Sequence, residues 1–144
     1  VFFFSSADTV YEPGALEVLA TAERDKITLC QDFPHWQTFG IGEEVVDTLG
    51  LFDEAYHPIY FEDTDYLWRA EAEGVAVVKK PIQVRHDNSS TIKSSHHYAS
   101  RNASTFAANK AYFESKKKAV VDLEAKIDQV DEEIEGVVRG LSKV

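Results

Sequence analysis

The stretch Val1-Phe2-Phe3-Phe4-Ser5-Ser6-Ala7-Asp8 decides the fold class of this chain. Four apolar residues that favour β-structure run into a polar loop, which predicts a buried strand followed by a loop. The next segment, Glu12-Pro13-Gly14-Ala15-Leu16, predicts a helix start, because proline is favoured at the first helical position. A strand followed at once by a helix is the repeating unit of α/β proteins, so an α/β domain is expected.

The alternation of strands and helices continues outward from this stretch. Apolar runs predict further strands at residues 27–30, 75–78 and 82–84. Helical spacing of apolar residues predicts helices at residues 43–49 and 62–73, each stopped by a glycine, Gly50 and Gly74. The segments between them are predicted to be turns and loops, among them the aromatic-rich residues 33–40, with a possible edge strand, and the polar residues 86–97.

Composition argues against two classes of partner. Hydrophobic residues make up 44% of the 144 residues, enough for a packed core, and the formal net charge is −10. An acidic surface repels phosphate backbones and anionic lipid, so neither nucleic acid nor a membrane surface is the expected partner. No apolar run approaches the roughly 18 residues of a membrane span. The single cysteine, Cys30, lies in an apolar run, which predicts a buried thiol and a cytoplasmic, reducing environment.

The densest group of acids outside the C-terminal region is Glu62, Asp63 and Asp65. At the start of the predicted helix, the three carboxylates fall within one turn. One interpretation is a capping cluster that interacts with the positive end of the helix dipole. The other is a general base in a cleft, with a neighbouring carboxylate that orients it or raises its pKa. Residue types alone leave both interpretations open.

Three further side chains are candidates for a binding site. Asp8 directly follows an apolar strand, where α/β folds place ligands, although an Asx turn explains the residue equally well. His86 follows a short apolar run and is either a metal ligand, a base or an ordinary surface histidine. Trp36 lies among polar residues in a predicted loop and is a candidate for stacking on a sugar face.

The order of five segments resembles the acceptor-side half of family 2 glycosyltransferases, which have the Rossmann-like GT-A fold, and rhamnosyltransferase-like members in particular. Residues 2–16 are similar to the family's metal-motif strand and the Pro-Gly-x-Leu helix start after it. Residues 43–54 resemble the acceptor-side helix and its Gly-x-Phe-Asp-Glu turn, and residues 60–70 the Glu-Asp-x-Asp helix with its arginine. Residues 74–78 and 84–86 resemble the closing strand and the histidine after it, and residues 89–91 and 109–112 resemble the region beyond.

The resemblance implies a role for each candidate residue. Asp63 would be the base that deprotonates the acceptor hydroxyl during inverting transfer from a nucleotide-sugar to a saccharide or protein acceptor. Glu62 would shape the acceptor pocket, and Asp65 and Arg69 would support the site. Asp8, with His86, would hold a divalent metal, Mg²⁺ or Mn²⁺. Ser6 stands where the family has the leading aspartate of its metal motif, so weak metal binding, or none, is implied.

The family's first half, which holds the nucleotide, would precede Val1. The chain is therefore expected to be part of a longer enzyme, in which residues 1–115 form a partial GT-A domain. The alternative is a non-catalytic assembly protein, for example in a viral particle, that reuses this half-fold as its body. Under that alternative the protein would be associated with a virion.

Residues 116–144 predict a separate helical arm. Apolar residues recur there at alternating spacings of three and four, which indicates a coiled coil and a homo-oligomer formed through this helix. A helix that packs back onto the domain is the other interpretation. The residues of this seam are Val120, Leu123, Ile127, Val130, Ile134, Val137 and Leu141.

Overall fold

The computed structural model describes residues 1–32, 34–57, 59–86 and 96–141. The chain divides into two compact units, Val1–Phe106 and Ala107–Val144. The first unit mixes strands and helices, in agreement with the predicted α/β class, and the second is helical.

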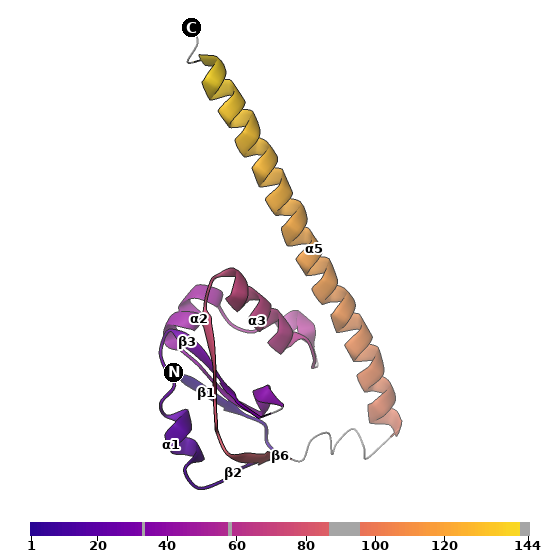
Figure 1. The fold of residues 1–144 in the computed structure, drawn as a ribbon. Coiled ribbons are helices and arrows are strands. Elements are labelled where there is room, and N and C mark those ends of the chain that lie inside the picture. The colour runs from indigo at the N-terminus through magenta and orange to yellow at the C-terminus, as the bar shows by residue number, and fades with distance from the viewer. Residues whose placement is uncertain (33, 58, 87–95, 142–144) are drawn as a thin grey trace. The chain divides into compact units, whose positions relative to one another are not determined.

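A four-stranded mixed sheet forms the centre of the first unit (Figure 1). Its strands are β1 (Phe2–Ser5), β4 (Thr38–Ile41), β3 (Lys26–Cys30) and β5 (Ala76–Lys80), in that order across the sheet. β3 and β5 pair in parallel, whereas β4 runs antiparallel to both of its neighbours. The predicted loop around Thr38 is therefore an interior strand, and β4 carries the backbone hydrogen bonds that join β1 to the rest of the sheet.

Helices pack on both faces of this sheet because the residues of β3 alternate between them. Ile27 and Leu29 point to the face covered by α2 (Glu43–Leu49) and α3 (Glu62–Ala72). Cys30 points to the opposite face, where it packs with Ile82 and with Ala15 and Leu19 of α1 (Ala15–Leu19). The thiol of Cys30 is buried, as the sequence predicted.

Short elements complete the unit. β2 (Thr9–Tyr11) pairs antiparallel with β6 (Val84–His86) in a second, two-stranded sheet. Two single-turn 3₁₀ helices, His35–Gln37 and Glu54–Tyr56, lie in the connections. The strand predicted at residues 82–84 therefore begins later, at Val84. Ile82 lies before the strand, and its side chain is buried.

Strand β1 forms, but the prediction that it is buried is wrong. It is the edge strand of the sheet, and Phe2, Phe3 and Phe4 are 49%, 51% and 40% exposed. Phe4 stacks on Phe39 of β4 at 4.8 Å and contacts Phe52 edge-on at 6.2 Å, so its ring is only partly covered. A run of three exposed aromatic residues on a free strand edge is the feature that most soluble proteins avoid.

Gly42 precedes α2 at a point where two backbone segments nearly touch. A Cβ atom at this position would lie 1.9 Å from the carbonyl oxygen of Arg24. We expect Gly42→Ala to lower the free energy of unfolding by about 3 kcal/mol or more, because the backbone must shift to admit the methyl group. Gly14→Ala is the matched control, since its φ of 88° is unfavourable for alanine but its surroundings are open. We expect about 1 kcal/mol for that variant. Equal urea-unfolding midpoints for the two variants would contradict the close approach at Gly42.

α5 (His96–Leu141) is a helix of 46 residues that contributes nearly all of the second unit. Its start lies a few residues before the helical pattern read from the sequence, which begins near Ser100. Among the described residues, no helix is both long enough and apolar enough to cross a bilayer.

Candidate functional site

The first turn of α3 holds Glu62, Asp63 and Asp65, as the helical pattern predicted. The two residues before it, Tyr60 and Phe61, have φ values of 80° and 72°. This left-handed conformation is costly for aromatic residues, and such strain concentrates at functional sites. The sequence gives no sign of it, because aromatic side chains do not mark positive φ as glycine does.

Asp63 is partly exposed at the start of this helix. Its Oδ1 accepts hydrogen bonds from the backbone N–H of Thr64 at 2.7 Å and from the Thr64 hydroxyl at 3.3 Å. Within the described part of the chain its Oδ2 has no hydrogen-bond partner. The carboxylate is thus held through one oxygen, and the lone pairs of the other are available to take a proton.

Glu62 is half-buried, and burial raises the pKa of its carboxyl group; the charge of Asp63 raises it further. The nearby backbone N–H groups of Glu62 and Tyr60 lower the pKa and partly offset this rise. The Oε2 atom is enclosed and meets no donor among the residues that the structure describes. An enclosed carboxylate oxygen of this kind costs stability, so the start of α3 combines backbone strain with an unfavourable charge.

The raised pKa of Glu62 predicts a pH-dependent stability. The folded protein binds this proton more tightly than the unfolded chain, so stability falls as pH rises from the ordinary glutamate pKa through the raised value. Glu62→Gln removes the charge, and we expect a higher melting temperature than wild type at neutral pH. The gain should vanish below about pH 4, where both states of the wild type are protonated. Glu71→Gln, on an exposed position of the same helix, is the control and should show neither effect.

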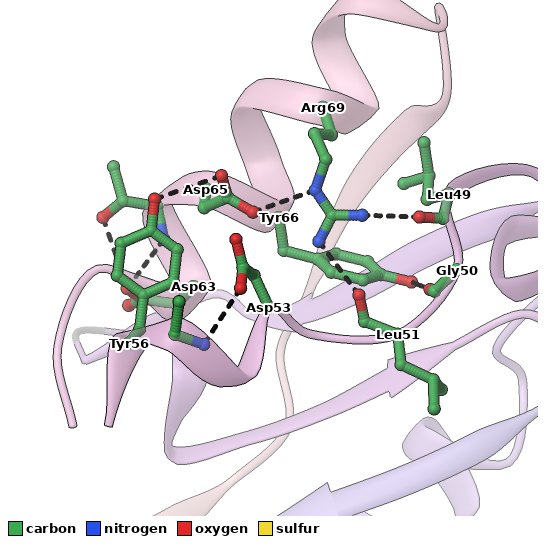
Figure 2. Close-up of polar contacts among 11 residues, drawn as sticks. Leu49, Gly50, Leu51, Asp53, Tyr56, Asp63, Asp65, Tyr66 and Arg69 are labelled. Carbon is green, nitrogen blue, oxygen red and sulfur yellow. Dashed lines mark hydrogen bonds and ion pairs between the residues drawn. The ribbon is translucent and has the colours of Figure 1, made fainter. Parts of the chain in front are cut away.

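Asp65 is fully buried and points away from Asp63 into the first unit (Figure 2). Its Oδ2 accepts from Nε of Arg69 at 2.9 Å, one turn along the helix. Its Oδ1 accepts from the hydroxyl of Tyr56 at 3.2 Å. Tyr56 itself is buried, with 3% of its surface exposed.

Arg69 extends the network to the segment after α2 (Figure 2). Its two terminal nitrogens donate to the carbonyl oxygens of Leu49, at 2.5 Å, and Leu51, at 3.0 Å. The hydroxyl of Tyr66 donates to the carbonyl oxygen of Gly50 between them, at 3.1 Å. α3 is therefore tied to the turn at residues 49–51 by three hydrogen bonds. The role of Asp65 and Arg69 in any reaction stays a prediction.

Trp36 lies in an aromatic cluster rather than alone in a loop. Its ring meets Phe39 edge-on at 4.6 Å and Phe52 at 6.2 Å, and Phe52 in turn meets Tyr66 of α3 at 4.6 Å. The cluster thus links the connection before β4 to α3. Stacking of Trp36 on a sugar remains a prediction, with the ring only partly exposed.

Asp8 is exposed in the turn between β1 and β2. Ser6 begins this turn, and its backbone carbonyl accepts from the N–H of Thr9 at 3.1 Å. Thr9 pairs with His86 across the small sheet, so the backbone brings positions 8 and 86 close together. The side chain of His86 lies outside the described residues, as do residues 89–91 of the resemblance. In the described part of the chain, no three His, Cys, Asp or Glu side chains are grouped for a metal.

Comparison with known proteins finds a short similarity. A stretch of 37 residues is 49% identical to a galactofuranosyl glycosyltransferase of Leishmania donovani. These residues are 26% of this chain and 8% of the Leishmania protein. No protein family matches the chain, and no solved structure matches it. The comparison supports similarity to a glycosyltransferase and goes no further.

Proposed function

We propose that this chain forms the acceptor side of an inverting, family 2-like glycosyltransferase of GT-A fold, which transfers sugar from a nucleotide-sugar to an acceptor hydroxyl. The observation that carries the proposal is the start of α3. There a partly exposed Asp63 has an available oxygen, while the residues around it bear backbone strain and an enclosed carboxylate. Proteins retain such unfavourable features where function requires them. The similarity to a galactofuranosyl glycosyltransferase supports the reaction class.

In the proposed reaction, Asp63 is the general base. As the acceptor hydroxyl oxygen attacks the anomeric carbon, the carboxylate takes the hydroxyl proton. The bond between the anomeric carbon and the diphosphate breaks, and its electron pair leaves with the nucleoside diphosphate. One displacement inverts the anomeric configuration, and Asp63 then releases its proton to solvent. Asp65 and Arg69 act indirectly, by fixing the axis of α3 against the turn at residues 49–51.

A divalent cation fits this scheme only as a partner of the substrate. Asp8 would supply one carboxylate and His86 an imidazole, and Ser6 is a weak ligand for Mg²⁺ or Mn²⁺. Most coordination positions would then be filled by diphosphate oxygens and water. When bound there, the ion would neutralise the charge that develops on the leaving diphosphate.

The free edge of β1 is where we place the nucleotide-binding part of a longer enzyme. Phe2, Phe3 and Phe4 leave apolar hollows on both sides of this edge. One of about 330 Å³ lies beside α1, lined by Phe3, Tyr11 and Leu16 among others. A smaller one of about 90 Å³ is lined by residues of the other face, Phe2 and Phe52 among them. A further strand with helices on both faces would bury these surfaces.

A transfer assay tests the proposed function. The polypeptide that contains this chain is incubated with nucleotide-activated sugars, beginning with galactofuranose because of the Leishmania protein, and with saccharide acceptors. Release of nucleoside diphosphate together with a product one sugar heavier, detected by mass spectrometry, is the expected result. Failure with a full panel of donors would favour the second candidate function, a non-catalytic assembly protein. The specific observation in its favour is the exposed apolar seam on α5.

A further inference from the structure

α5 carries an exposed apolar stripe along its C-terminal half. Six side chains spaced by alternate steps of three and four residues are each between 37% and 63% exposed. They are Val120, Leu123, Ile127, Val130, Ile134 and Val137. A spacing that averages 3.5 residues keeps these side chains on one side of the helix, in the a and d positions of a heptad repeat. Isolated apolar residues on a protein surface do not show such regular spacing, so we expect another helix to pack against this seam.

We propose that further copies of this chain pack against it through the same seam. The helices of the copies are parallel and in register. Ile127 and Ile134 occupy a positions, whereas Val130 and Val137 occupy d positions. β-branched residues at both positions favour bundles of more than two helices over a dimer. This inference is independent of the proposed glycosyl transfer.

A hollow on the helix surface is consistent in its lining with packing against such a bundle. Its lining includes Val130, Glu133, Ile134 and Val137, which are successive d, g, a and d positions. Four residues in this order form the hole that receives an a-position side chain from a parallel neighbour in register. The side chain at that level of a second copy is Ile134 itself.

The charges beside the seam also favour a parallel neighbour with the same sequence. Lys126 at a g position faces Asp131 at the following e position of a parallel neighbour. In an antiparallel pair, the e positions of one helix face the e positions of the other. Glu124 and Asp131 would then face acidic side chains of the second copy and repel them. The hydrogen-bonded pair Arg139–Glu135 lies on the outer side of the helix and leaves the seam unobstructed. Residues 107–144 hold seven basic and eight acidic residues, so self-repulsion does not oppose the bundle.

A matched pair of substitutions tests self-association. Ile127→Asp places a charge in the seam, and Val121→Asp makes the same type of change at a b position off the seam, where the side chain is also exposed. In sedimentation equilibrium of the whole chain at micromolar concentration, we expect wild type and Val121→Asp to be oligomers. Ile127→Asp should weaken association by about 10²-fold or more, because each copy would bury an unpaired charge. Circular dichroism verifies that all three proteins remain helical.

A charge exchange tests the parallel register. Lys126→Asp should weaken association, and Lys126→Asp combined with Asp131→Lys should restore it, because the exchanged charges again face each other across the interface. Residues five apart do not face each other within one helix, so the rescue reports a contact between copies. A wild-type chain that sediments as a monomer overturns the proposal. Equal weakening by Val121→Asp and Ile127→Asp overturns the seam, and a double variant without rescue overturns the parallel register.

Discussion

Replacing Asp63 by asparagine is expected to lower the turnover of glycosyl transfer by about 10² or more. Asparagine has nearly the shape of aspartate and can still accept through Oδ1 from Thr64, but it cannot take the acceptor proton. In the proposed mechanism Asp63 acts on the acceptor, so donor binding should persist. The measurement is the steady-state rate of nucleoside diphosphate release, together with the donor dissociation constant.

Asp47→Asn is the matched control for that experiment. Asp47 is an exposed aspartate of α2, so the substitution repeats the loss of one charge on a neighbouring helix. We expect wild-type turnover from this variant. A folded Asp63→Asn protein with wild-type turnover would remove Asp63 from the mechanism.

The second large effect concerns Asp65, and it is an effect on stability. Asp65→Ala leaves the Nε of Arg69 and the hydroxyl of Tyr56 without their shared acceptor inside the first unit. Breaking a buried pair costs about 3–5 kcal/mol, and we expect about 3 kcal/mol because the Arg69 side chain keeps 20% of its exposure. Urea unfolding followed by circular dichroism measures the loss.

A double-mutant cycle separates the pair from other effects of the substitution. Arg69→Met combined with Asp65→Ala should cost clearly less than the sum of the two single changes, because each partner is costly only when the other remains. Additive losses, or a loss below about 1 kcal/mol for Asp65→Ala, would contradict the buried pair. Asp63→Asn should leave stability nearly unchanged. Of the two aspartates in one motif, Asp63 would then affect turnover and Asp65 would affect stability.

Helix periodicity carried most of the correct fold predictions. The bounds of α2 agree with the pattern because Val45, Val46 and Leu49 face one side and Gly50 ends the helix. The strands were harder to predict from the sequence. Thr38–Ile41 contains a glycine and only four residues, so nothing in the sequence marks β4 as an interior strand. Glycine suits position 40 because a Cβ atom there would lie 3.2 Å from the ring of Phe3, which is closer than an ordinary van der Waals contact.

Burial of a strand depends on its neighbours, which a local pattern does not show. The apolar run at β1 would be the same in the middle of a sheet, and only the strand order reveals that its outer edge is free. The site shows the same division. Spacing predicted that Glu62, Asp63 and Asp65 share a turn, but not that Asp65 is buried while Asp63 stays accessible. That difference comes from Tyr56, in the 3₁₀ helix before α3, and from Arg69, one helical turn further along α3, which both donate to Asp65.

The anomeric configuration of the product tests the central claim most directly. Nuclear magnetic resonance of the transfer reaction, followed from its first turnovers, reports the configuration at the transferred carbon before it can equilibrate. A single displacement assisted by Asp63 predicts a product whose configuration is opposite to that of the nucleotide-sugar. A product that keeps the donor's configuration would contradict the account, because it requires either two displacements or a mechanism in which Asp63 is not the base.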